Sequence, residues 1–309
     1  MDEPRNPATE DSGRQGSYTL DNHERCEPKL TFFDIPVELI LEVLCLASAS
    51  SQSTYKSLLL VSRQFYGIVQ TNCLQAVPIT LDGYEQLASF ENFIRATPEV
   101  QDYVRFLWIM GHGLTCWGLI HSILELSTGI VSLSCTTRSL TSICSSLAFK
   151  HTQCTDLTLV ETWHAWNDVL ETPHGARLCA QVTRLRLHEG LSPEFPKQHF
   201  TALTHIAFSS RPIQEYIERH LAALRPLRGL RQIVVTTFWW RDEAPDSGTS
   251  KLLDLDGRLS ILHCRRNWTE LVAWQARVRG GFDLWEQARL ERKSMHVFRG
   301  AFKMVRPRS

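Results

Sequence analysis

Apolar positions in this chain follow two periods, one of two residues and one of three to four. Between residues 104 and 263, seven short runs each carry an apolar-x-apolar pair, the alternation expected of a strand with one buried face. The first members of these pairs recur every 21 to 28 residues. The pairs are Leu107/Ile109, Leu133/Cys135, Leu157/Leu159, Leu185/Leu187, Ile206/Phe208, Ile233/Val235 and Leu259/Ile261.

Helical patterns lie between these strands. Apolar residues return at intervals of three or four within 119–124, 140–147 and 217–224, which predicts helices there. Strands that alternate with helices build either a doubly wound parallel sheet or an αβ solenoid. The short, regular period favours the solenoid, in which each unit buries its apolar face only by stacking on its neighbours. We therefore predict an α/β fold with a repeat domain over residues 76–265.

The N-terminal part of the chain reads differently. Residues 1–29 lack apolar periodicity, which predicts a disordered arm. The stretch "FFDIPVELILEVLCLA", Phe32 to Ala47, is almost wholly apolar after Pro36, which suits the first turn of a helix from about residue 36 to 47. Because this helix is apolar around most of its circumference, we expect one face to pack inward and another to meet a partner. A second helical region follows at 55–70.

Residues 30–75 resemble an F-box. The resemblance rests on Ile-Pro-x-Glu-Leu-Ile-x-x-Val-Leu at 35–44, followed by Leu-Leu-Val-Ser-Arg-x-Phe-Tyr at 59–66. It implies a helical domain that binds a Skp-type adaptor and, through it, the cullin of an SCF-type ubiquitin ligase. The matching positions imply these adaptor contacts: Ile35, Pro36, Leu39, Ile40, Val43 and Leu44. A plain three-helix cap that closes the next domain is the alternative interpretation.

The repeat body resembles an irregular leucine-rich-repeat domain that lacks the asparagine or cysteine position in most units. F-box heads joined to degenerate repeats of this kind are typical of lineage-expanded fungal families. Residues 266–309 contain two further helical patterns, at about 268–278 and 283–293, and end in a basic tail. We interpret them as a helical cap, because the last repeat would otherwise expose its core. "RDEAPDSGTSK" at 241–251 predicts a loop.

Side chains between the inward pairs should face the other side of the sheet, because strand side chains alternate. In a solenoid this concave side commonly binds partners, which makes it a predicted target-contact patch; a solvated sheet face is the alternative. The patch consists of Thr158, Arg184, Arg186, His188, His205 and Ser209.

Composition adds limits to this interpretation. The formal net charge is zero, and 43% hydrophobic and 21% charged residues describe an ordinary folded protein, so no nucleic-acid or membrane partner is expected. The apolar run at 35–47 is too short to span a bilayer. Nine cysteines without a C-x-x-C pair indicate free thiols in a reducing compartment. With a polar N-terminus that resembles no signal peptide, they predict an intracellular protein, cytoplasmic or nuclear.

Catalytic signatures are missing from the sequence. It contains no G-x-S-x-G, P-loop, G-x-G-x-x-G or H-E-x-x-H motif. His112 with Cys116, and His151 with Cys154, are pairs and fall short of a four-ligand zinc set, so we expect no metal and no cofactor. We predict a non-catalytic substrate-recognition subunit of an SCF-type ubiquitin ligase, acting in the ubiquitin conjugation pathway that leads to protein degradation. The alternatives are a leucine-rich-repeat scaffold with an F-box-like cap and, less favoured, an α/β enzyme with cryptic catalytic groups.

Overall fold

The computed structural model describes residues 34–111, 113–146, 150–161, 166–192, 194–210, 213–238, 252–264, 269–281 and 283–304. The chain divides into two units, residues 1–37 and 38–309, and only Asp34–Val37 of the first are described. The arm expected at 1–29 and the loop expected at 241–251 lie outside the described residues.

The centre of this unit is an open parallel sheet. In the described part of the chain its eight strands lie side by side in sequence order, β1 to β8, without the reversal that a doubly wound sheet requires. The protein is therefore α/β with one parallel sheet. The strands are β1 Pro78–Asp82, β2 Phe106–Met110, β3 Ser132–Cys135, β4 Asp156–Leu159, β5 Arg184–Leu187, β6 His205–Ser209, β7 Gln232–Phe238 and β8 Leu259–Cys264.

Strand register confirms the seven predicted apolar pairs. Leu107 lies opposite Leu133 and Leu133 opposite Leu157, and this row continues to Leu259; the second row runs from Cys135 to Ile261. Every member of these pairs is at most 2% exposed. The first strand was missed: Ile79 and Leu81 extend both rows, and β1 begins with Pro78, at a position where a strand tolerates proline.

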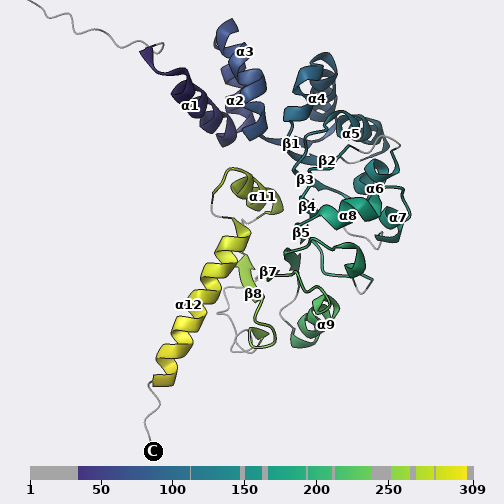
Figure 1. Cartoon of the computed structure of the whole chain (residues 1–309), viewed down its shortest axis with the longest axis vertical. Helices are drawn as coiled ribbons and strands as arrows, with labels where there is room; N and C mark the ends of the chain where they lie inside the picture. Colours follow the sequence, from purple (N-terminus) through teal and green to yellow (C-terminus); the bar gives the residue numbers. More distant parts are fainter. Residues whose placement is uncertain are drawn as a thin grey trace, which may run out of the picture. The chain divides into compact units, whose positions relative to one another are not determined.

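Helices that follow the strands cover one face of the sheet. Figure 1 shows α4 to α9 along the same side of the strands, where they bury the two apolar rows. The helices predicted within 119–124 and 217–224 are confirmed as α5 and α9, and the one predicted within 140–147 is confirmed as α6 up to Ser145; Leu147 lies outside the described residues. The bounds are α4 Tyr84–Ala96, α5 Leu114–Leu126, α6 Thr137–Ser145, α7 Trp166–Leu170, α8 Gly175–Gln181, α9 Gln214–Leu224, and the short 3-10 helices η2 Leu74–Ala76, η3 Pro98–Tyr103 and η4 Lys197–His199.

Among the described residues, the α-helices before the sheet are α1 Val37–Ser50, α2 Gln52–Leu59 and α3 Arg63–Asn72. The predicted first helix is confirmed and runs three residues further. The second predicted region, 55–70, is divided between α2 and α3, and a serine side chain caps the start of each helix. Ser51 accepts a hydrogen bond from the Thr54 amide at 2.9 Å, and Ser62 accepts one from the Phe65 amide at 3.2 Å. We call residues 38–76 the head.

The C-terminal helices are α11 Glu270–Val278 and α12 Leu284–Met304. In Figure 1, α11 lies on the opposite side of the sheet from α4 to α9. α12 packs Leu284, Trp285 and Ala288 against the same second face at the last three strands. The C-terminal helices were expected to cover the core of the last repeat, but α11 contacts β2, β3, β4 and β5 instead.

Candidate protein-binding surfaces

The outer face of α1 is an exposed apolar stripe. Leu39, Val43 and Leu46 are 51%, 59% and 66% exposed and follow one another at helical spacing. Ile40 and Leu44, on the inner face, are only 8% and 4% exposed and belong to the main core. The helix therefore has two apolar faces, and the chain covers one of them.

This burial sorts the six predicted adaptor contacts. Leu39 and Val43 are accessible; Ile35 and Pro36 are also exposed, in the first unit. For Ile40 and Leu44 the prediction is wrong, because buried side chains in the head core cannot contact an outside protein directly. Leu46 was missed, although its position three residues after Val43 already placed it on the same helical face.

A second exposed apolar pair lies in the turn between α2 and α3. Leu60 is 86% exposed and Val61 is 60% exposed. Both belong to the Leu-Leu-Val-Ser-Arg segment on which the F-box resemblance rests. A single exposed leucine is common in folded proteins, whereas adjacent apolar residues at this exposure suggest a contact surface.

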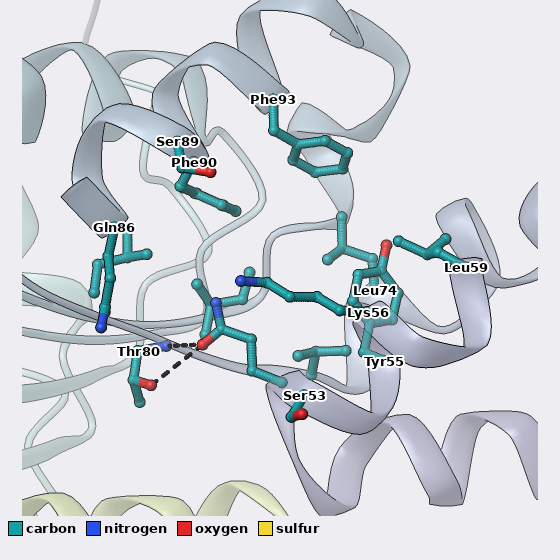
Figure 2. A pocket seen from close by; sticks show the side chains of 14 residues that line it. Ser53, Tyr55, Lys56, Leu59, Leu74, Thr80, Gln86, Ser89, Phe90 and Phe93 are labelled. Atoms are coloured by element: carbon teal, nitrogen blue, oxygen red, sulfur yellow. Dashed lines mark hydrogen bonds between the residues drawn. The ribbon is translucent and has the colours of Figure 1, made fainter.

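The free edge of the sheet, at β1, is occupied by side chains. The side-chain oxygen of Gln52 accepts hydrogen bonds from the Thr80 amide and the Thr80 hydroxyl, both at 3.2 Å (Figure 2). The side-chain oxygen of Gln86 accepts a bond from the Asp82 amide at 3.0 Å. Between α2 and α4 these residues border an apolar cavity of about 460 Å³. Because the outward amides are already paired, this edge is protected against an added strand.

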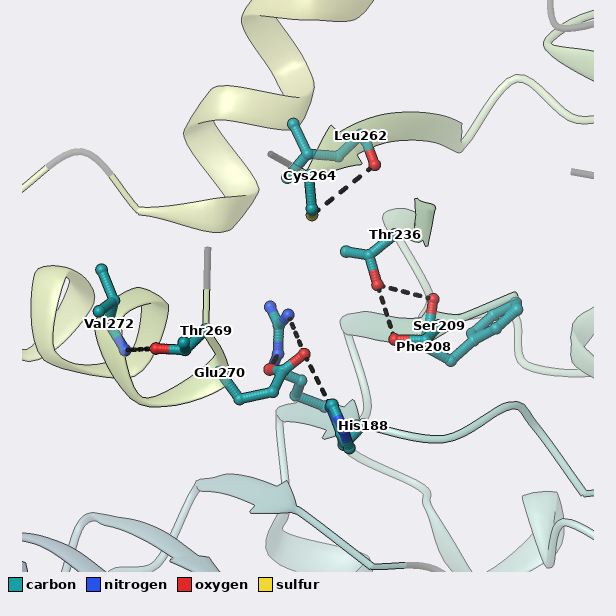
Figure 3. Close-up of polar contacts among 10 residues, drawn as sticks. His188, Phe208, Ser209, Thr236, Leu262, Cys264, Thr269, Glu270 and Val272 are labelled. Atoms are coloured by element: carbon teal, nitrogen blue, oxygen red, sulfur yellow. Dashed lines mark hydrogen bonds and ion pairs between the residues drawn. The ribbon is translucent and has the colours of Figure 1, made fainter. Parts of the chain in front are cut away.

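The second face of the sheet carries a buried ion pair. Arg186 on β5 contacts Glu270 at the start of α11 through two guanidinium nitrogens, with Nη2 at 2.7 Å from Oε1 (Figure 3). The two side chains are only 8% and 5% exposed. A two-point contact of this kind between a guanidinium and a carboxylate is directional as well as strong, and it fixes the start of α11 over β5.

His188 adds a third group to this cluster. Its Nδ1 lies 3.3 Å from Oε1 of Glu270, and its side chain is 42% exposed. The hydrogen bond with Glu270 raises the pKa of His188 above its usual value. Burial alone would raise the pKa of Glu270, but Arg186 and His188 outweigh it and hold that pKa below the usual value. The cluster therefore favours a charged Glu270.

The rest of α11 is tied to the strands before β5. Trp274 donates from Nε1 to the Ser132 hydroxyl at 3.0 Å, and its ring meets Trp108 edge-on at 5.8 Å. Arg277 forms an ion pair with Asp156 and donates to Ser132 at 2.9 Å. Trp274 is only 2% exposed. α11 is thus anchored to β2, β3, β4 and β5 by buried polar and aromatic contacts.

These contacts correct the predicted target-contact patch. Five of the six residues lie in strands, opposite the apolar rows as the alternation predicts, and His188 follows directly after β5. Of these residues, Thr158 and Arg186 are only 1% and 7% exposed. They do not form part of an open surface. The other four are partly exposed, and three of them contact their own chain: His188 lies 3.3 Å from Glu270, the His205 ring meets Trp285 at 5.3 Å, and Ser209 bonds Thr236 at 3.0 Å. Arg184 is the fourth, and it is also partly exposed.

Glu270, Trp274 and Arg277 are the residues that sequence reasoning missed. Arg186 and Glu270 are 84 residues apart in the chain, so no local pattern joins them. The sequence of 268–285 held a partial signal, because it combines three tryptophans with polar positions. Burying a carboxylate is costly unless it is paired, so a helix that only closes the end of a solenoid does not need one.

Other candidate chemistry is sparse. His151 and Cys154 are buried next to β4, and burial lowers the pKa of His151 to about 4. His112 lies outside the described residues. Among the residues that are described, no cluster of three or more His, Cys, Asp or Glu side chains could hold a metal ion. No helix in that part of the chain is long and apolar enough to cross a membrane.

No protein-family model matches this chain, and a comparison with curated proteins found no match.

Proposed function

We propose that this protein is the substrate-recognition subunit of an SCF-type ubiquitin ligase. The head binds a Skp-type adaptor and, through it, a cullin, and the body is a degenerate leucine-rich-repeat solenoid that binds a target protein. The chain makes and breaks no bonds itself. Holding the target close to the charged ubiquitin carrier raises the effective concentration of target lysines.

One observation carries the proposal: the stripe Leu39, Val43 and Leu46 is exposed on a helix whose other apolar face is already in the core. These positions belong to the segment that resembles an F-box. Burying a leucine or valine that is about half exposed contributes roughly 1 kcal/mol, so three such side chains supply a sizeable share of a protein–protein contact. The exposed Leu60 and Val61 add apolar area in the second motif.

The sheet supports the proposal for the body. Strands in sequence order, with their connecting helices on one face, are the arrangement that stacked αβ repeats produce. The part of the predicted target patch that remains accessible is its rim, Arg184 and His188 with the partly exposed edges of His205 and Ser209. We assign Thr158 and Arg186 a structural role beneath α11.

Binding of the full-length chain to a purified Skp-type adaptor tests the adaptor contact. We compare Leu39→Asp/Val43→Asp with Val272→Asp, because Val272 on α11 is 52% exposed and matches Leu39 in exposure. An aspartate in the first turn of α11 is also compatible with the helix dipole. We expect the double variant to bind at least tenfold more weakly, roughly the loss of two half-buried apolar contacts plus a buried charge, and the control to bind normally.

A protein-binding scaffold with a helical cap is the second candidate, and the contacts of α2 favour it. Gln52 covers the outer amide of Thr80, and Tyr55 and Leu74 belong to the same core as the strands. A solenoid cap would make these contacts too. The same assay separates the two functions, since absence of adaptor binding by the folded wild-type chain, or equal binding by the double variant, would contradict the ligase proposal.

A further inference from the structure

Two cysteines meet inside the head. Cys45, on α1, and Cys73, which ends α3, have their sulfur atoms 3.6 Å apart although they are 28 residues apart in the chain. Both are free thiols, and Cys45 also donates to the Asn72 carbonyl at 3.5 Å. A disulfide needs a sulfur–sulfur distance of about 2.0 Å, so the sulfur atoms must approach by roughly 1.5 Å.

Only one of the two thiols can be reached from outside. Cys45 lines an open cavity of about 460 Å³ between α1 and the residues at the end of α11, with Leu46 and Ala49 beside it. Cys73 is 0% exposed and adjoins the core. A small oxidant therefore reaches Cys45 first, and Cys73 lies immediately behind it.

We propose that Cys45 and Cys73 are an oxidation site, at which a hydroperoxide oxidises Cys45 and Cys73 then closes a disulfide between α1 and α3. In the first step the Cys45 sulfur attacks a peroxide oxygen, the O–O bond breaks, and Cys45 becomes a sulfenic acid while one water, or an alcohol from an organic hydroperoxide, leaves. In the second step the Cys73 sulfur attacks the Cys45 sulfur, the S–O bond breaks, and the departing hydroxide takes the Cys73 proton to form water. Two thiols lose two electrons, and one hydroperoxide gains them.

The order of the steps follows from the surroundings of each thiol. Burial, with the hydrogen bond from Cys45, raises the pKa of Cys73 to about 12. Cys73 is therefore almost wholly protonated near neutral pH and is a poor first nucleophile, but it needs to react only with a sulfur already in contact with it. The second step should be slow compared with that of a dedicated redox sensor, because the thiolate is the reactive form.

Tryptic mapping tests the site directly. Lys29, Lys56, Arg63 and Arg95 place the two cysteines in separate peptides, 30–56 and 64–95, each with a single cysteine. The full-length chain with Cys26→Ser is treated with hydrogen peroxide, quenched with iodoacetamide and digested without reductant. We expect the two peptides to appear as one linked species that lacks two hydrogen atoms and separates on reduction. The linked protein should also unfold at higher urea concentration than the reduced one.

Matched variants fix the roles. In Cys73→Ser, Cys45 should accumulate as a sulfenic acid that dimedone traps, and in Cys45→Ser, Cys73 should stay a thiol. Iodoacetamide should label Cys45 at least about tenfold faster than Cys73 in the native chain, since Cys45 is accessible and Cys73 is buried. Cys154, which is 0% exposed, serves as the buried control and should stay reduced.

A linked species that forms only in denaturant, or Cys45 sulfenic acid that persists in the wild-type chain while Cys73 stays a thiol, would overturn the inference. Because the linked peptide is detected in the unmutated pair, failure of a variant to fold cannot mask the result. The readout does not involve adaptor or target and is therefore independent of the proposed function.

Discussion

Replacing Glu270 with alanine removes the carboxylate that faces Arg186 beneath α11. Arg186 would keep its position on β5, where its side chain is 8% exposed, but without its two-point contact with Glu270. Removing one partner of a buried ion pair lowers the free energy of unfolding by about 3–5 kcal/mol, because the other charge stays buried where it is poorly solvated. Since the whole free energy of unfolding of a domain is about 5–15 kcal/mol, this is a large fraction of it.

The comparison with a double replacement isolates the cause. Arg186→Met/Glu270→Leu removes both charges at similar volume, and we expect its free energy of unfolding to lie within about 1–2 kcal/mol of the wild type or above it. Glu270→Gln keeps the shape and one acceptor, and should cost an intermediate amount, about 1.5–3 kcal/mol, the value of a hydrogen bond to a charged group.

Urea unfolding followed by circular dichroism gives the three free energies, and limited trypsin digestion at Arg277 and Arg279 reports whether α11 leaves the sheet. We expect faster cleavage there in Glu270→Ala than in the double variant. If Glu270→Ala cost less than about 1 kcal/mol, or if the double variant were no more stable than the single one, the burial argument for this pair would be refuted.

Three further predictions concern His188, Glu270 and the two faces of α1. Because the pKa of His188 is raised in the folded chain, its stabilising contribution should be complete below its unfolded pKa of about 6.5 and fall as pH rises through the folded value; the stability difference between wild type and His188→Gln should shrink accordingly across pH 5.5–9. The lowered pKa of Glu270 acts in the opposite range, so acidification from about pH 5 to pH 3 should destabilise the wild type more than Glu270→Gln, by urea titration at each pH. Leu44→Ala should cost about 2–5 kcal/mol and Leu46→Ala less than about 0.5 kcal/mol in urea unfolding, since the side chains are 4% and 66% exposed; equal costs would contradict the two-faced α1.

The head shows how far local patterns reach. Helical spacing placed Leu39 and Val43 on one side of α1 and Ile40 and Leu44 on another, and the structure has the same division. Both sides are equally apolar, however, so spacing alone does not say which of them is buried. That choice depends on the rest of the core, in which Ile40 and Leu44 are buried together with residues of the later helices and strands.

The second face of the sheet shows where local patterns stop. Strand alternation placed Thr158 and Arg186 opposite the apolar rows, and this is confirmed by their register. Whether that face is open was not encoded in the strands, because its cover comes from α11, 84 residues after Arg186. Local patterns also do not show which part of the sheet a distant helix covers, so the C-terminal helices were interpreted as an end cap.

By itself the sequence determined the repeating order of strands and helices, the parallel sheet that follows from it, and an N-terminal helix with more apolar surface than one face can bury. Only the tertiary structure decided which apolar face of α1 stays exposed, that α11 lies over Arg186 and Thr158, and that Cys45 meets Cys73. The physical reason is that a two- or 3.6-residue period fixes which side chains share a face, a local property of the backbone. Exposure of that face depends on which remote segment offers a complementary charge, ring or apolar surface, and no local period carries that information.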